Sequence, residues 1–252
     1  MTSDCGLYVY AVVPADTRIG GVQPGVGDGQ PDLIRHEDLG LVAHEIDLAD
    51  LARLNEPSAD PGQLAELAQR HDHVVRAAMD AAAAVLPFRL GTVLANRPSA
   101  RQFLVDRCEA LRRGLDRLTN CAEWGVTVRE EGSSEPQRTL SESTPDRPGT
   151  AYLTGRRQQL DDAEFLRRTR SARAAQVDEA LRELSVESAH GPKRGVTVLL
   201  DETYLVRRPE TSTFLDAFDR CGAWLSGEGI VLRLTGPWPP YSFARLEGGQ
   251  TD

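Results

Sequence analysis

The sequence predicts an α+β protein of two domains, and three observations lead to this prediction. Short apolar runs rich in β-branched residues alternate with longer segments of helical periodicity. Residues 131–149, rich in Ser, Pro and Glu, separate these elements into two groups and are typical of a flexible linker. After this linker, the elements follow the order β-α-β-β-α-β of a ferredoxin-like split βαβ domain. The predicted parts are an N-terminal mixed α+β sheet domain (1–130), the linker (131–149), a C-terminal ferredoxin-like domain (150–245) and a tail (246–252).

The N-terminal domain is predicted to begin with strands and to continue with helices. Residues 7–13 (LYVYAVV) form an apolar run typical of a buried strand, and the glycine-rich residues 17–31 after it indicate a loop. Apolar residues recur at helical spacing over 61–85, where Asp60 and Pro61 suit an N-cap and a first turn. The remaining elements are strands at 32–35, 40–46 and 123–129, helices at 48–54 and 98–118, and a strand or extended loop at 88–94.

The C-terminal domain is predicted from a similar alternation. A strand at 151–153 precedes a long helix over 161–186, whose acidic first turn suits the helix dipole. Two strands at 196–200 and 204–208 are then joined by a hairpin at 201–203, and a helix over 212–226 leads to a last strand at 230–235.

Composition excludes several classes of protein. Hydrophobic residues make up 40% of the 252 residues and charged residues 27%, which is enough to build a core. No run reaches the ~18 apolar residues that span a membrane, and the polar start does not resemble a secretory signal. The net charge of −9 provides no basic footprint for nucleic acid. Four cysteines without a C-x-x-C pair favour free thiols in a reducing cytoplasm.

The search for chemistry identifies no catalytic, metal or cofactor site. His71 and His73 lie two residues apart on a predicted helix, so their side chains point in different directions and cannot share one ion. We interpret His71 as a residue at the edge of the core and His73 as a surface residue. His36 and His44 lie near Glu37 and Glu45, but their spacing is not specific. No nucleophile elbow is present.

Two further patterns have ordinary interpretations. The glycines between Gly20 and Gly29 match neither a Walker loop nor a dinucleotide fingerprint, and they indicate a mobile loop. An arginine cluster at the helix that follows the linker could bind an acidic partner or RNA, but we interpret it as a solvated helix face, which is the more common case. The cluster consists of Arg156, Arg157, Arg167, Arg168, Arg170 and Arg173.

Three short segments combine aromatic residues, proline and charge: VLPFRLGT at 85–92, EWGV at 123–126 and TGPWPPYSF at 235–243. The three prolines of the last segment stiffen its backbone and display its aromatic side chains at a low cost in entropy. These side chains either cover an exposed face of the core or form a rigid docking surface for another protein.

With these segments the sequence resembles the gas vesicle protein F/L family, whose members are accessory proteins of gas vesicle formation. The resemblance rests on the same three segments, on LYVY at 7–10, on His71 with the two valines at 74–75, and on AYL at 151–153. Leu90 and Thr127 depart from residues common in the family. The choice between an F-like and an L-like member stays open.

The resemblance implies a fold, a function and a set of partners. The fold is a two-domain α+β protein with a ferredoxin-like second domain. The function is non-enzymatic. The protein would lie in the cytoplasm, associated with the gas vesicle, and would bind the hydrophobic shell protein and other accessory proteins during nucleation or assembly. Residues 87–89 and 238–241 would then contain the interface or its support, with the expected members Pro87, Phe88, Arg89, Trp238, Pro239 and Tyr241.

Two alternative functions remain open at this point. Ferredoxin-like domains often bind metabolites, so a small-ligand-binding regulatory module is one alternative, supported by analogy of fold alone. The other is an enzyme of the ferredoxin-like oxygenase kind, with His71 or His44 as an acid–base or haem-binding group.

Overall fold

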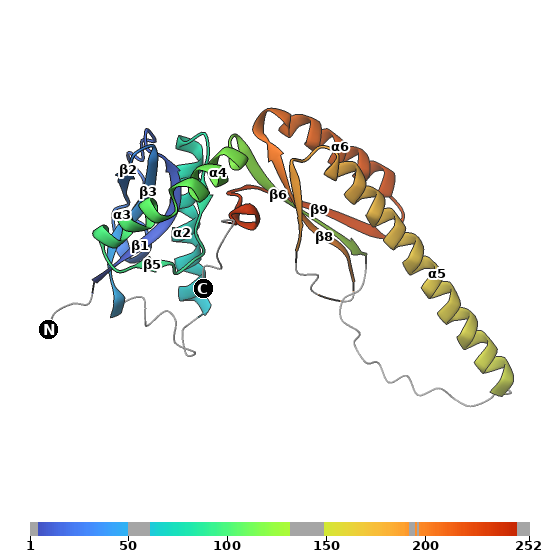
Figure 1. The fold of residues 1–252 in the computed structure, drawn as a ribbon. Coiled ribbons are helices and arrows are strands. Elements are labelled where there is room, and N and C mark those ends of the chain that lie inside the picture. Colours follow the sequence, from blue (N-terminus) through green and yellow to red (C-terminus); the bar gives the residue numbers. More distant parts are fainter. Residues whose placement is uncertain (1–4, 50–60, 132–148, 192–194, 196, 246–252) are drawn as a thin grey trace. The chain divides into compact units, whose positions relative to one another are not determined.

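The computed structural model describes residues 5–49, 61–131, 149–191, 195 and 197–245 (Figure 1). These residues form an α+β fold with two antiparallel sheets and five helices. The chain divides into two compact units. Unit 1 comprises Met1–Glu123, Arg207–Pro209 and Gly236–Asp252, and unit 2 comprises Trp124–Val206 and Glu210–Thr235.

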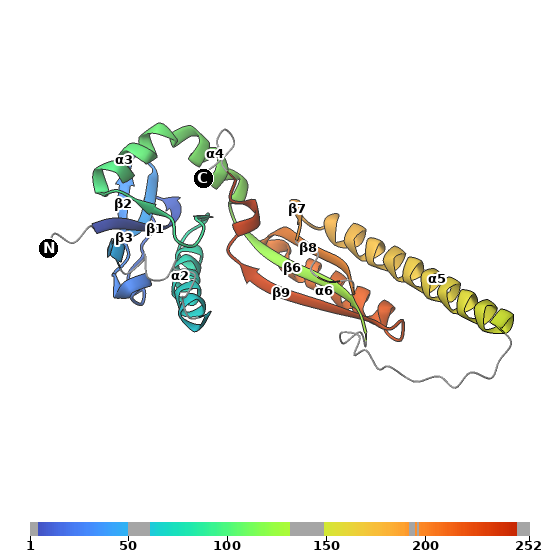
Figure 2. The ribbon, with the colours of Figure 1, turned by 90° about the horizontal axis from the view of Figure 1, so that it is seen from below.

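Unit 1 is built on a sheet of order β2-β3-β1-β4, with β5 also paired to β1. Residues 6–13 of β1 are all buried, because α2 covers one face of the sheet and α3 and α4 cover the other (Figure 2). The pairing of β1 with β3 is antiparallel and shifts by one residue between Val9 and Ala11. The strands are β1 (Cys5–Pro14), β2 (Asp32–His36), β3 (Leu39–Asp47), β4 (Leu86–Pro87) and β5 (Val93–Leu94), and the helices are α2 (Pro61–Ala81), α3 (Arg97–Asp106) and α4 (Cys108–Leu118).

The first three strands predicted for this unit are confirmed, and its helices need correction. The helix expected over 98–118 is two helices, since Arg107 leaves the helical conformation between α3 and α4. The helix expected to reach 85 ends at Ala81, and the extended segment 88–94 contains only the two residues of β5 as strand. The helix expected over 48–54 lies mostly outside the described residues.

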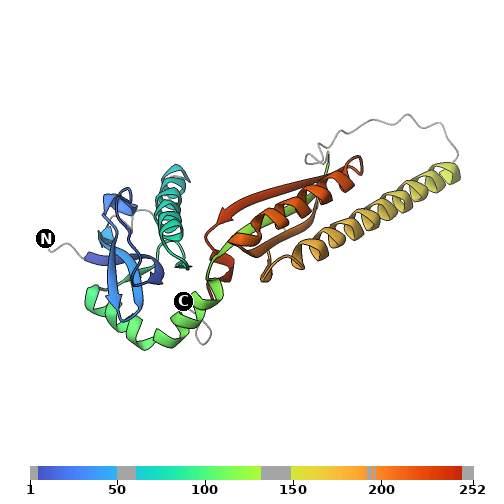
Figure 3. The same ribbon diagram turned by 90° about the horizontal axis from the view of Figure 1, so that it is seen from above.

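Unit 2 is built on a sheet of order β7-β8-β6-β9. Its elements follow the order β6-α5-β7-β8-α6-β9, and both helices lie on one face of the sheet (Figure 3). The core between them includes Trp124, Tyr204 and Phe214. The strands are β6 (Cys121–Glu130), β7 (Glu187–His190), β8 (Val198–Arg207) and β9 (Ile230–Trp238), and the helices are α5 (Gly149–Arg182) and α6 (Thr211–Leu225).

Two predictions for the second half of the chain were wrong. Residues 151–153 are not a strand but belong to α5, a helix of 34 residues. The predicted hairpin at 201–203 is also absent, because β8 runs straight through these residues and pairs with β7, a segment to which the prediction assigned no element. Polar residues such as Asp201 and Glu202 interrupt the apolar pattern of β8 and suggested a turn.

The two units divide the chain differently from the predicted domains 1–130 and 150–245. Most of β6 belongs to unit 2, because this strand lies between β8 and β9 in the second sheet. Residues after Gly236 return to unit 1. The predicted linker falls at residues 132–148, outside the described part of the chain. Within the described residues, no helix is long and apolar enough to cross a membrane.

Candidate functional site

The core of unit 1 contains two chains of hydrogen bonds that each join a tyrosine to a histidine. In the first chain, the backbone N–H of Gly91 donates to the Tyr8 hydroxyl oxygen (3.1 Å). Tyr8 Oη lies 3.0 Å from His71 Nδ1, and His71 Nε2 lies 3.3 Å from the carbonyl oxygen of Phe88. Because a carbonyl only accepts, Nε2 carries the proton of a neutral His71 and Nδ1 accepts from Tyr8. A buried helix residue is thereby tied to the segment 88–91.

The second chain of hydrogen bonds also runs from a backbone N–H through a tyrosine hydroxyl to a histidine Nδ1, but the other ring nitrogen of this histidine has no partner in the described part of the chain. The backbone N–H of Val26 donates to the Tyr10 hydroxyl oxygen (2.9 Å), which lies 3.1 Å from His44 Nδ1. Within the described residues, Nε2 of His44 is buried and has no partner. Tyr10 therefore holds the loop before β2 against the core, and His44 is the less satisfied of the two histidines.

The glycine-rich loop is shaped by this second chain. A Cβ atom at Gly29 would lie 1.8 Å from Cδ2 of His44, and one at Gly25 would lie 2.0 Å from the Tyr10 hydroxyl oxygen. Only glycine lets the backbone approach these rings so closely. The glycines that gave no phosphate-binding pattern therefore serve to close the loop over buried polar groups.

Burial sets the protonation of the network. It lowers the pKa of His71 to about 4 and lowers the pKa of His44. It also raises the pKa of Tyr8 to about 12 and raises that of Tyr10. All four side chains are therefore neutral near pH 7. His71 engages both ring nitrogens, Nδ1 with Tyr8 and Nε2 with the Phe88 carbonyl, and this geometry favours a structural role for it.

The predicted segment 87–89 is fixed by this core and exposes part of itself. Pro87 is buried in β4 opposite Ala11. The N–H of Phe88 donates to the carbonyl oxygen of Tyr10 (2.8 Å), and its half-buried ring lies 5.8 Å from the ring of Phe103. Arg89 is exposed.

The C-terminal segment of unit 1 is fixed against α2. The guanidinium of Arg76 lies over the Trp238 ring, 4.1 Å from its centroid, and donates to the Pro237 carbonyl oxygen (3.1 Å). Arg76 also pairs with Asp72 (Nε–Oδ2, 2.5 Å), whose other oxygen accepts from the Tyr241 hydroxyl (3.4 Å). Trp238 nevertheless remains 37% exposed.

Glu123, the acidic residue of the EWGV motif, also fixes the C-terminal segment of unit 1. Glu123 is buried, and it accepts hydrogen bonds from the backbone N–H of Ser242 (2.8 Å) and from its hydroxyl (2.9 Å). Burial raises the pKa of Glu123, and both bonds from Ser242 oppose that rise. Arg117 of α4 donates to the carbonyl oxygen of Phe243, a fully buried residue. Two of the three segments singled out in the sequence are therefore in direct contact.

His71 brings the two predicted groups of site residues together. Its Nε2 contacts the Phe88 carbonyl, and its ring centroid lies 6.3 Å from that of Tyr241. We call Phe88, Arg89, Trp238 and Tyr241 the aromatic surface. Arg89 and Trp238 are exposed and Phe88 and Tyr241 are half-buried, while the other two predicted residues, Pro87 and Pro239, are buried. The sequence analysis missed the pair of Asp72 and Arg76, which hold Tyr241 and Trp238 in place. Their spacing of four residues on a helix was the available signal.

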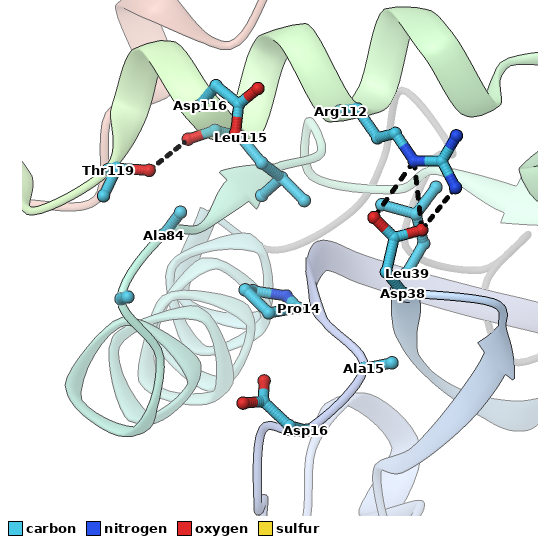
Figure 4. Close-up of a pocket in the computed structure, with 11 residues that line it drawn as sticks. Pro14, Ala15, Asp16, Asp38, Leu39, Ala84, Arg112, Leu115, Asp116 and Thr119 are labelled. Carbon is cyan, nitrogen blue, oxygen red and sulfur yellow. Dashed lines mark hydrogen bonds and ion pairs between the residues drawn. The ribbon is translucent and has the colours of Figure 1, made fainter.

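A pocket of about 410 Å³ lies elsewhere in unit 1, between the end of β1, the turn before β3 and helix α4 (Figure 4). Arg112 on its wall pairs with Asp38, and Leu39 and Leu115 are its apolar lining. Arg112 holds the pKa of Asp38 below its ordinary value. The main cation of the wall is thus already neutralised, so this pocket gives limited support to the ligand-binding alternative.

One cluster in the described part of the chain could offer three donors to a metal ion. Ligand atoms of Glu37, Asp38 and Cys108 lie within 4.8 Å of one another. Arg112 donates to both carboxylates (2.6 Å each), so an ion would have to displace a guanidinium. Burial and the neighbouring carboxylates raise the pKa of the Cys108 thiol, which further disfavours the thiolate that binds metals.

Fold and site together define an α+β protein of two units, the first of which holds two aromatic segments in place through buried polar contacts. The family model described as "Gas vesicle synthesis protein GvpL/GvpF" matches residues 6–245. The chain belongs to this family, which implies a role in gas vesicle assembly.

Curated relatives and solved structures agree with this assignment. Gas vesicle protein L from a Streptomyces species is 33% identical, over 98% of this chain and 95% of its own. Gas vesicle protein L2 from Halobacterium salinarum is 28% identical, over 95% and 91%. The crystal structure of the gas vesicle protein GvpF from Anabaena matches with a TM-score of 0.72 at 18% identity, covering 98% of this chain and 99% of the other, and so supports the fold.

Proposed function

We propose that this protein is a non-enzymatic accessory factor that binds the hydrophobic gas vesicle shell protein in the cytoplasm during nucleation or assembly, and that it also contacts other accessory proteins there. A small, very apolar subunit needs a partner that covers it before it joins the wall, because exposed apolar surface aggregates. Neither a membrane nor a nucleic acid is part of this proposal.

The observation that carries the proposal is the convergence of two distant segments on His71. Phe88 and Tyr241, both half-buried, meet His71, and each of the two segments also carries an exposed side chain, Arg89 in one and Trp238 in the other. Aromatic and arginine side chains held rigidly in advance lose little entropy on binding and are enriched at interface hot spots. For unit 2, we propose the ferredoxin-like class, supported by its β-α-β-β-α-β order and its sheet order β7-β8-β6-β9.

The test is co-precipitation of the tagged protein with the shell protein of the same gene cluster, co-expressed with it. We expect selective recovery of the shell protein over an unrelated hydrophobic peptide. Trp238→Ala should reduce recovery at least tenfold with little change in melting temperature. If Trp238 is instead only a structural cover, the variant should melt at a lower temperature and still bind.

The chain offers a matched control for this variant. Trp224 in unit 2 is 41% exposed and also lies under a guanidinium, that of Arg173, at 4.4 Å. Trp224→Ala therefore removes an equally exposed, similarly stacked ring outside the aromatic surface, and recovery should not change. Equal losses in the two variants would contradict a specific role for Trp238, and failure of the folded wild-type protein to recover any shell protein would overturn the proposed binding.

A further inference from the structure

Helix α5 extends well beyond the sheet that it covers (Figures 1 and 3). Its first buried side chain among those described is Ala174, and residues 160–168 are all exposed. Phe165 in this projecting half is 72% exposed, more than any other large apolar residue in the described part of the chain. Leu166 beside it is 45% exposed. The helix thus carries an apolar protrusion that nothing in the described part of unit 2 covers.

The other half of α5 borders a groove. Together with α6 it encloses about 420 Å³, lined by the small residues Ala180 and Ala217 and by the larger Leu184 and Trp224. Glu183 and Arg220 add one charge of each sign to the lining. Space for an apolar side chain therefore exists on the same helix that carries the apolar protrusion.

Helical geometry places the protrusion and the groove on one side of α5. At 100° per residue, Phe165 and Glu183 point in the same direction, and Ala180 lies about 60° away. Phe165 and Ala180 are separated by about 22 Å along the axis, at 1.5 Å per residue. Two copies of α5 that pack antiparallel would place each Phe165 opposite the Ala180 of the other copy. A two-fold axis makes both contacts at once.

The charges along α5 fit the same antiparallel register. On the side toward α6, Asp162 of one copy comes opposite Glu183 of the other, which is a pair of like charges. On the opposite side, Glu164 comes beside Arg182, and Arg168 lies beside Glu179. The two pairs on that side join opposite charges and outnumber the one like-charge pair, which favours this register over a parallel one.

We propose that two copies of this protein associate through the α5–α6 face of unit 2, each inserting Phe165 into the groove of the other. A buried phenylalanine ring contributes roughly 150–250 Å², so two rings and two Leu166 side chains form a small interface. Association is therefore expected in the micromolar range and is reversible. The occupant of the groove is a second copy of this chain, because only a second copy supplies the matching protrusion and charges by symmetry.

The first test is sedimentation velocity of the full chain over a wide concentration range, without shell protein. The wild-type protein should shift from monomer to dimer as its concentration rises. Phe165→Ala should raise the dissociation constant at least tenfold. Leu160→Ala is the matched control, since Leu160 is 58% exposed on the same helix and points about 140° away from Phe165. A monomer at every concentration, or equal effects of both variants, would overturn the proposal.

A mixing experiment tests the symmetry itself. Ala180→Glu retains a helix-forming residue but blocks the groove with a charge, so this variant should also dimerise weakly. In an equimolar mixture of the two variants, the Ala180→Glu chain supplies an intact Phe165 and the Phe165→Ala chain supplies an open groove. The mixture should therefore associate more tightly than either variant alone, and circular dichroism confirms that both are folded. If mixing gives no gain, the proposed pairing of Phe165 with the groove is wrong.

Discussion

The two units solve the problem of a stable core in different ways. In unit 1, Tyr8 and Tyr10 bury hydroxyl groups that are fully engaged with histidines and backbone N–H groups. In unit 2, the centre of the core is the packing of Phe214 against the rings of Trp124 and Tyr204, at centroid distances of 6.3 and 5.7 Å. A core with buried polar groups is stable only if each group has its hydrogen-bond partner, whereas an apolar core is stable if side chains of suitable volume fill it. Unit 1 therefore specifies which loops cover it.

This difference explains why the aromatic surface belongs to unit 1. The hydrogen bonds of His71 and Tyr8 reach the backbone of Phe88 and Gly91, so the core itself determines the position of surface residues. In unit 2 the Tyr204 hydroxyl bonds to the Asp178 side chain of α5, so this polar contact reaches a helix side chain and not the backbone of a loop. The predictions below probe this contrast, beginning with the largest effect.

The packing of unit 2 is most sensitive at Phe214, which is fully buried. Phe214→Ala should lower the free energy of unfolding by about 3–5 kcal/mol, because it leaves a cavity between α6 and the sheet. Urea denaturation measures the loss, and hydrogen exchange shows where it falls. Amides of β8 should lose protection while those of β1 and β3 keep it. Equal loss of protection in both sheets would show that the cores are not separate.

The polar core of unit 1 should make it sensitive to acid. His71 has its pKa lowered to about 4 from an ordinary 6.5, so the unfolded chain takes up a proton that the folded protein refuses. The stabilisation is therefore complete above pH 6.5 and is lost as the pH falls through about 4. A difference of this size corresponds to about 3 kcal/mol.

The matched variant for this prediction is His71→Gln, whose amide can accept from Tyr8 and donate to Phe88 but does not titrate. It should cost some stability at pH 7 and remove most of the dependence on pH between 6.5 and 4. Urea denaturation at several pH values measures both. Because Glu123 has its pKa raised, it opposes the trend in wild type and variant alike, and the difference between them isolates His71. An unchanged pH profile would contradict the assignment.

A smaller effect is expected where the glycine-rich loop approaches His44. A methyl group at Gly29 would meet the imidazole at 1.8 Å, so Gly29→Ala forces the loop or the ring to move. We expect a loss of about 1–3 kcal/mol in the free energy of unfolding. Gly20→Ala is the control, because nothing lies within 4 Å of the added atom. Similar stabilities of the two variants would show that the loop adapts at little cost.

Much of this architecture could be predicted from residue patterns, because those patterns reflect burial on one or both faces. The run LYVYAVV predicted β1, and helical spacing predicted α2 and α6. The prediction failed at β8, where the buried Glu202 pairs with His190 of the neighbouring strand β7. No local pattern encodes this contact between two segments. It failed again at 151–153, where apolar residues extend a helix instead of forming a strand.

The site was predictable in part for a related reason. Proline and aromatic residues indicated the two surface segments, but only the fold shows that His71 lies between them. Asp72 and Arg76 carried no distinctive signal, because such pairs are common on solvated helices. Contacts between single polar atoms that lie far apart in the sequence cannot be predicted from residue patterns alone.

The finest test of the contrast between the units is a pair of Tyr→Phe substitutions, each removing one buried hydroxyl. In Tyr8→Phe the loss leaves His71 Nδ1 and the Gly91 N–H without their partner inside the core, so the cost should be about 1–3 kcal/mol. In Tyr204→Phe the lost bond is to Asp178 (2.8 Å), which also pairs with Arg182 and is only partly buried.

Water and Arg182 can satisfy Asp178 after that substitution, so Tyr204→Phe should cost only about 0.5–1.5 kcal/mol. Urea denaturation at pH 7 compares the two variants directly. Tyr8→Phe should in addition raise hydrogen exchange at Gly91 and Thr92, in the segment that follows Phe88, whereas Tyr204→Phe should leave that segment unchanged. If the two hydroxyls prove equal in cost and neither affects residues 88–92, the polar core of unit 1 does not position the aromatic surface.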